Sequence, residues 1–125
     1  MNRPLAWVTG ANRGIGRGIS AALAARGFDI VGTDLAENDD SRITARMVQE
    51  AGGSFRFLQG DISQAGEASR LVMEATQERP LHCLVNNAGG QTRHRVDILE
   101  LPEAEFARIM AVNLKGVLLG TKHGV

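Results

Sequence analysis

The sequence contains no tyrosine and only one cysteine among its 125 residues. One thiol cannot form a disulfide within the chain, and the apolar neighbours of Cys83 predict an inert core residue rather than a reactive thiol. The three histidines show no spacing typical of metal ligands, so we expect no metal site.

A charge excess of either sign and long apolar runs are also absent. The chain has 14 basic and 14 acidic residues, and no basic stretch is interleaved with aromatic residues, which argues against a nucleic-acid partner. No apolar run approaches the roughly 18 residues that a membrane span requires, so we expect no membrane partner. A strand-like run begins at Leu5 and leaves no room for a signal peptide, which predicts a cytoplasmic protein.

What the chain does contain is an alternation of short apolar runs and helical patterns. The runs are continuous rather than alternating, as expected of parallel strands buried on both faces. They cover residues 5–8, 29–33, 54–58 and 81–85, and the helical patterns cover residues 15–26, 43–51, 68–75 and the segment after Pro102. We therefore predict one α/β domain over residues 1–125, a truncated Rossmann-type doubly wound parallel sheet with strand order 3-2-1-4.

A glycine-rich motif, TGANRGIG, occupies residues 9–16 between the first strand and the first helix. The start of a helix leaves backbone N–H groups unpaired and carries positive partial charge, so it attracts phosphate. We expect Gly10 to allow the sharp turn and Gly14 to leave room for a phosphate. We expect Gly16 and Gly18 to let the helix lie close to the sheet. The spacing G-x-x-x-G-x-G differs from the generic dinucleotide fingerprint G-x-G-x-x-G.

An acidic residue, Asp34, ends the second apolar run, 18 residues after Gly16. A carboxylate at this spacing is placed to accept hydrogen bonds from the ribose hydroxyls of NAD, and it would repel the 2′-phosphate of NADP. The alternative is that Asp34 is a solvated turn residue or caps the next segment.

Two further motifs follow later apolar runs. Asp61-Ile62 follows the third run and, taken alone, is equally consistent with a turn in which Asp61 or Ser63 caps a helix. Asn86-Asn87-Ala88-Gly89 follows the fourth run, where small residues allow close approach of the backbone to a ribose and paired amides can tie strand ends together. A generic turn is the alternative for this motif too.

In this order the four motifs resemble the short-chain dehydrogenase/reductase family, and the overall pattern is similar to 3-oxoacyl-carrier-protein reductases. The resemblance implies an oxidoreductase that transfers a hydride between a nicotinamide and an alcohol or ketone substrate. It places Asp61 at the adenine edge and makes Asn86 mainly structural. Arg13 could meet a 2′-phosphate, but Asp34 makes us favour NAD over NADP. The implied cofactor-binding residues are Gly10, Asn12, Arg13, Gly14, Ile15, Gly16, Asp34, Leu35, Asp61, Ile62, Asn87, Ala88, Gly89 and Val112.

The helix predicted after Pro102 carries the candidate catalytic residue. Its apolar face is defined by Phe106, Ile109 and Met110. Asn113 falls on this face, seven residues after Phe106. A buried amide must be hydrogen-bonded, so Asn113 either bends the helix and is satisfied locally or, as the resemblance implies, holds a water in a catalytic proton relay. Gly116 and Gly120 would let another helix pack closely, and the resemblance implies a homo-oligomer, either dimer or tetramer.

The catalytic Ser and the Tyr-x-x-x-Lys of the resembled family have no counterpart here, because the chain has no tyrosine. Neither Lys115 nor Lys122 has a tyrosine four residues before it. We therefore expect a fragment of a longer oxidoreductase that lacks the catalytic half and is inactive alone. The alternative is a non-catalytic dinucleotide-binding or sensor module. The polar residues 91–95 are predicted to form a surface connection or a substrate-side loop.

Overall fold

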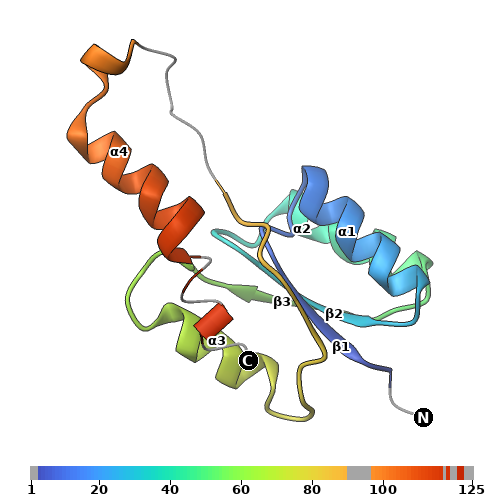
Figure 1. The fold of residues 1–125 in the computed structure, drawn as a ribbon. Helices are drawn as coiled ribbons and strands as arrows, with labels where there is room; N and C mark the ends of the chain where they lie inside the picture. Colours follow the sequence, from blue (N-terminus) through green and yellow to red (C-terminus); the bar gives the residue numbers. More distant parts are fainter. Residues whose placement is uncertain (1–2, 90–96, 117, 119–120, 123–125) are drawn as a thin grey trace.

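The computed structural model describes residues 3–89, 97–116, 118 and 121–122. Its centre is a four-stranded parallel sheet in the order β3-β2-β1-β4 (Figure 1), which confirms the predicted topology. The strands are β1 (Leu5–Thr9), β2 (Asp29–Asp34), β3 (Phe55–Gln59) and β4 (Cys83–Val85).

Helices cover both faces of this sheet. α1 and α2 lie together on one face and α3 lies on the other, while α4 stands apart near the end of the described chain (Figure 1). After β4 the chain forms a short 3₁₀ helix, η1, and α4 then runs directly into a π-helical turn, η2. The bounds are α1 (Gly14–Ala25), α2 (Asp39–Glu50), α3 (Glu67–Ala75), η1 (Ile98–Glu100), α4 (Glu103–Met110) and η2 (Ala111–Lys115).

The central strand β1 divides the core into two halves, because successive side chains of a strand point to opposite faces. Trp7 packs with Leu71 of α3, whereas Val8 packs with Ala24 of α1 and Val48 of α2. All five residues of β1 are buried, which explains why this strand is apolar without alternation. The indole of Trp7 donates a hydrogen bond of 3.0 Å to the hydroxyl of Thr33 on β2.

The amino end of the sheet is closed by ion pairs. The carboxylate of Asp29 lies 3.1 Å from Arg3 and 2.9 Å from Arg79, and it also accepts from the backbone N–H of Ser54 at 2.9 Å. Burial opposes ionisation of Asp29, but the hydrogen bonds from Ser54 and Arg79 outweigh it and hold the pKa of this carboxyl below its usual value. The charge at this end is therefore satisfied within the chain.

Several local expectations need correction or fall outside the described residues. Gly18 is exposed, and a Cβ built on it meets nothing within 4 Å, so Gly16 alone provides the close approach of α1. The predicted polar connection at residues 91–95 lies outside the described residues. Within the described part of the chain, no helix combines the length and the apolar composition needed to cross a bilayer.

Candidate functional site

The carboxyl ends of the four strands meet at one edge of the sheet, and a cavity of about 510 Å³ opens there. Its walls come from the ends of β1 and β2, from the segments after β3 and β4, and from α4 with its π-helical turn. In open parallel sheets, ligands bind in the crevice outside this edge. The predicted site residues that line it are Gly10, Asp34, Leu35, Asp61, Ile62, Ala88, Gly89 and Val112.

Three glycines shape the loop between β1 and α1. Gly10 adopts φ 68°, and a Cβ there would lie 2.9 Å from the Cα of Ala88, so the turn needs both a left-handed backbone and a missing side chain. A Cβ on Gly16 would collide with the carbonyl oxygen of Gly10. Gly14 differs, because it adopts φ 58° and a Cβ there meets nothing within 4 Å. The side of the loop at Gly14 is therefore open, as an approaching ligand requires.

The N-termini of α1 and α2 differ in their capping. Arg13 precedes α1 in extended conformation, no described side chain caps the helix, and its first turn carries no acidic residue. Asn38 caps α2 by accepting hydrogen bonds from the N–H groups of Asp40 at 3.0 Å and Ser41 at 3.3 Å. Two N–H groups in the first turn of α2 are thus satisfied by a side chain, whereas no described side chain satisfies those of α1, an arrangement that suits an anion. Because α1 has no side-chain cap among the described residues, it lacks the roughly 1 kcal/mol of stabilisation that such a cap contributes.

Asp34 lies at the end of β2 on the cavity wall. Its carboxylate accepts hydrogen bonds from two backbone N–H groups, that of Asn12 at 3.0 Å and that of Leu35 at 2.9 Å. No cationic side chain among the described residues forms an ion pair with it. The carboxylate therefore orders the glycine-rich loop and keeps further lone pairs for donors such as ribose hydroxyls.

Asp61 also lies on the cavity wall, in a tight turn of its own. One carboxylate oxygen accepts from the backbone N–H of Ser63 at 3.0 Å and from its hydroxyl at 2.6 Å. Burial opposes ionisation of Asp61, but these hydrogen bonds prevail and lower the pKa of its carboxyl. The alternative in which Asp61 or Ser63 caps a helix is wrong, because α3 begins only at Glu67 and its N-cap is Gly66, although the turn itself is present.

Thr9 joins the ends of β1 and β4, a role that the sequence analysis missed. Its hydroxyl oxygen accepts from the N–H groups of Asn87 and Ala88, both at 3.0 Å. The amide of Asn87 in turn donates to the carbonyls of Thr9 and Gly10, both at 3.1 Å. Asn87 thus ties strand ends together instead of lining the cavity, and it places Ala88 on the cavity wall. The side-chain amide of Asn86 donates to the hydroxyl of Thr121 at 2.9 Å.

The π-helical turn after α4 carries Val112 and Asn113. Val112 lines the cavity, whereas Asn113 is exposed and its carbonyl oxygen would lie 2.7 Å from a Cβ on Gly89. The expected burial of Asn113 is wrong, because the helix face that carries Phe106 is itself exposed in this structure. Asn113 also lies in a π-helical turn, which the sequence pattern did not predict. The lining of the cavity by Ala104 and Arg108 on α4 was not predicted.

Three other predicted residues lie beside the cavity without lining it. Arg13 and Ile15 are exposed at the start of α1, where the side chain of Ile15 is 77% accessible. Asn12 is buried, and its side-chain amide donates to the carbonyl of Ala36 at 2.8 Å. Gly116 faces Ile62 of the same chain, since a Cβ there would lie 2.8 Å from the Ile62 side chain. Gly120 lies outside the described residues.

Comparison with known proteins agrees with this geometry. The family model described as short chain dehydrogenase matches residues 4–125. The (3R)-3-hydroxyacyl-CoA dehydrogenase of Mus musculus is 40% identical over 126 residues, covering 94% of this chain and 48% of that protein. The 2-dehydro-3-deoxy-D-gluconate 5-dehydrogenase of Bacillus subtilis is 33% identical over 117 residues, covering 94% of this chain and 44% of that protein.

Solved structures show the same likeness. The 3-oxoacyl-[acyl-carrier protein] reductase from Brucella melitensis, crystallised in complex with NAD, superposes with a TM-score of 0.86 at 36% identity, covering 98% of this chain and 48% of that one. The chain therefore spans about half the length of the proteins that it resembles. The match of the family model over nearly all of its residues shows that this chain belongs to the short-chain dehydrogenase family.

Proposed function

We propose that residues 1–125 form the dinucleotide-binding part of an NAD-dependent oxidoreductase that acts on an alcohol or ketone. The observation that carries the proposal is the open start of α1 beside a cavity that Asp34 borders. The relatives named above are dehydrogenases and reductases, and one of them is described in complex with NAD.

The residues present suit a dinucleotide. The N–H groups at the start of α1 would hold the pyrophosphate, and Gly14 leaves the approach open. Asp34 would accept hydrogen bonds from the hydroxyls of the adenosine ribose, and its negative charge would oppose a 2′-phosphate, which favours NAD over NADP. Asp61 and Ile62 would border the adenine, and Leu35, Val112, Ala88 and Gly89 also line the cavity. The bound dinucleotide would supply hydride transfer to or from the substrate carbon.

For Asn113 we propose the role of holding a water molecule in the proton relay. Its exposed amide beside Gly89 is consistent with contact to solvent at the cavity rim. Because the chain spans only about half the length of its relatives, the activity is proposed for the whole protein. Cytoplasmic localisation stays a prediction.

We also propose that the protein assembles as a homo-oligomer. Phe106, Met110 and Leu114 recur every four residues along α4 and η2, and their side chains are 54%, 38% and 59% accessible. An exposed apolar stripe of this kind marks a contact surface. Size-exclusion chromatography with light scattering should show a dimer or a tetramer, and a monomer at micromolar concentration would contradict the proposal.

The decisive experiment is a calorimetric titration of the protein with NADH and with NADPH, followed by a turnover assay of the full-length gene product on a panel of alcohols and ketones. We expect binding of NADH, weaker binding of NADPH, and turnover of at least one substrate. Binding without any turnover would favour a non-catalytic dinucleotide-binding module. Binding of neither nucleotide would refute the proposed function.

A further inference from the structure

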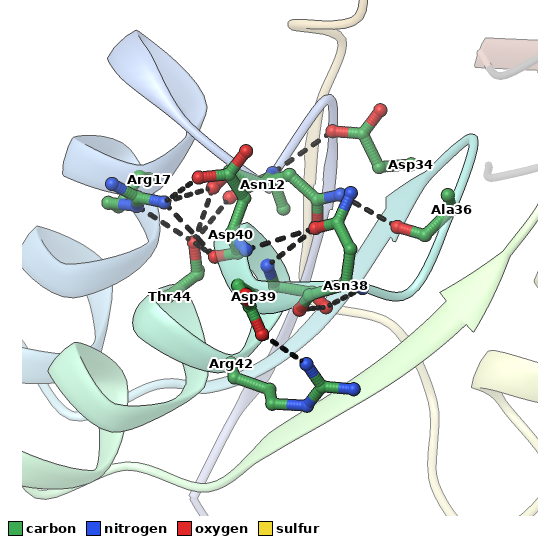
Figure 2. Close-up of polar contacts among 11 residues, drawn as sticks. Asn12, Arg17, Asp34, Ala36, Asn38, Asp39, Asp40, Arg42 and Thr44 are labelled. Atoms are coloured by element: carbon green, nitrogen blue, oxygen red, sulfur yellow. Dashed lines mark hydrogen bonds and ion pairs between the residues drawn. The ribbon is translucent and has the colours of Figure 1, made fainter.

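A polar cluster lies behind the glycine-rich loop and connects it to α1 and α2 (Figure 2). Its centre is formed by Arg17 of α1 and Thr44 of α2, which contact each other through a hydrogen bond of 3.2 Å from Nε to Oγ1. The side chain of Thr44 is fully buried and that of Arg17 is 21% accessible, and neither residue lines the cavity. Their polar groups therefore act on the loop and not on a ligand.

Arg17 binds the loop through the carbonyl oxygen of Asn12. Its Nη2 donates to this oxygen at 2.6 Å, and the same nitrogen lies 3.1 Å from the carbonyl of Asp40 and 3.3 Å from its carboxylate (Figure 2). The guanidinium thus spans from the loop to the first turn of α2. Because one partner in each of these hydrogen bonds is charged, each is stronger than a neutral hydrogen bond.

Thr44 reaches the same stretch of backbone from α2. Its hydroxyl oxygen lies 2.9 Å from the carbonyl oxygen of Ala11 and 3.0 Å from that of Asn12. The same oxygen lies 3.2 Å from the carbonyl oxygen of Asp40 in its own helix. A hydroxyl has a single proton, so it serves these three acceptors in alternation or by a shared bond. Without the hydroxyl, the carbonyl oxygen of Ala11 would lose its described partner in the protein interior, which is costly.

Asn12 is also hydrogen-bonded on its opposite side. The backbone N–H of Asn12 donates to Asp34, and its side-chain amide donates to Ala36, so the loop is fixed from two directions (Figure 2). The carbonyl oxygens of Ala11 and Asn12 consequently face α1 and α2. A carbonyl oxygen turned toward a pyrophosphate would repel it, whereas the N–H groups that follow in α1 attract it. The cluster therefore sets the polarity of the loop.

We propose that Arg17 and Thr44 are positioning residues of the dinucleotide site, which turn the loop carbonyls inward so that the N–H groups of α1 meet the pyrophosphate. This inference rests on the proposed function, because it assumes that a dinucleotide binds there. It assigns the two residues a role in affinity for the phosphates without any contact with the ligand.

The test compares two pairs of variants with a control. Arg17→Ala and Thr44→Val remove the hydrogen bonds, while Arg17→Lys and Thr44→Ser keep a donor at each position. Arg42→Ala serves as the control, since Arg42 is an exposed arginine of α2 that pairs only with Asp39 among the described residues. For each protein, the dissociation constants of NADH, ADP and adenosine are measured by titration, and the melting temperature is recorded without nucleotide.

We expect Arg17→Ala and Thr44→Val each to raise the dissociation constants of NADH and ADP by about tenfold, which corresponds to the loss of one charge-assisted or buried hydrogen bond. Adenosine, which carries no phosphate, should change by less than about twofold, a difference that a general loss of folding would not produce. Thr44→Ser and Arg17→Lys should recover most of the loss, and Arg42→Ala should bind as the wild type does.

Two outcomes would overturn the inference, and they are distinguishable from failure of the proposed function. If the wild type binds NADH and both Arg17→Ala and Thr44→Val bind it equally well, the inference is wrong and the proposed function stands. If the variants lose adenosine and ADP in equal measure, the cluster supports the whole fold and not the phosphate loop. If the wild type binds no dinucleotide, the proposed function falls and the inference falls with it.

Discussion

The two ends of β2 carry one aspartate each, and the chain treats them in opposite ways. Asp29, at the amino end, is held between Arg3 and Arg79, so its charge is satisfied internally. Asp34, at the carboxyl end, accepts from two backbone N–H groups, has no ion pair within the described part of the chain, and borders the cavity. Arginine ion pairs therefore neutralise the aspartate at one end of this strand, whereas the aspartate at the cavity end forms no ion pair with any described residue.

The helix starts follow the same division. In a parallel sheet each following helix begins at the carboxyl edge of the strand before it, so α1 and α2 both present their positive ends on that side. Asn38 and the acidic residues Asp39 and Asp40 complete the start of α2, whereas the start of α1 has no such side chains. Among the described residues, the helix start without a side-chain cap and the carboxylate without an ion pair thus lie at the same edge of the sheet.

The largest expected effect comes from closing the open side of the loop. Gly14→Val should raise the dissociation constant of NADH by about a hundredfold or more, equivalent to about 2.8 kcal/mol. The branched side chain would fill the space through which the ligand approaches the N-terminus of α1. Titration of the variant with NADH measures this. Gly27→Val is the matched control, since Gly27 also has a positive φ of 103° and open space around it but lies at the far end of α1. The control should lose stability without losing NADH affinity, and equal NADH affinity of wild type and Gly14→Val would contradict the docking.

Removing the ion pairs at the amino end of the sheet should lower the stability of the protein and leave its affinity for NADH unchanged. Asp29→Asn should lower the free energy of unfolding by about 2 kcal/mol, because Arg3 and Arg79 lose their charged partner. Urea denaturation measures the loss, and NADH affinity should stay the same. A variant with unchanged stability but weakened NADH would reverse the roles assigned to the two ends.

The same carboxylate predicts a pH dependence. Because the pKa of Asp29 is lowered in the folded protein, its contribution to stability is complete above the usual value of 3.8. The contribution is lost as the pH falls from there through the lowered pKa, since the unfolded state then takes up the proton first. Between pH 5 and pH 3, the stability difference between wild type and Asp29→Asn should therefore shrink, as urea denaturation in this range can show.

A smaller effect on binding is expected at the open end. Asp34→Ala should weaken NADH by about tenfold and reduce the preference for NADH over NADPH, because the ribose hydroxyls lose their acceptor and a 2′-phosphate loses its repulsion. Parallel titrations with both nucleotides measure the ratio. Asp39→Ala, an exposed aspartate on α2, should leave the ratio unchanged. An unchanged preference in Asp34→Ala would show that the ribose lies elsewhere.

The smallest effect concerns the capped helix. Asn38→Ala should cost about 1 kcal/mol of stability, the usual contribution of an N-cap side chain, and should not alter NADH affinity. Thermal denaturation with and without NADH distinguishes the two quantities. If this variant loses NADH affinity without losing stability, the N-terminus of α2 takes part in binding as well as that of α1.

Much of the site could be predicted because its residues follow strands at characteristic spacings. Asp34 and the Ala88-Gly89 pair each end or follow an apolar run, and parallel strands bring such ends together. Thr9 and the Arg17–Thr44 cluster escaped prediction, because nothing in their local sequence distinguishes them from ordinary helix or strand residues. Asn113 was expected to be buried, but the helix face that carries Phe106 is exposed, and burial depends on tertiary packing that an apolar pattern does not contain. The π-helical turn was missed as well, since the pattern assumes 3.6 residues per turn.

By itself, the sequence determined the strand order, the glycine turn and the residues that reach the carboxyl edge, since short-range spacing and apolar patterning are local properties. Only the tertiary structure decided which polar groups have hydrogen-bond or ion-pair partners within the chain. Asp29 and Asp34 are the same amino acid five positions apart on one strand, and their difference arises from arginines and backbone amides that fold against them from distant parts of the chain. Such partners depend on how layers pack, and that packing brings together residues that no local pattern connects.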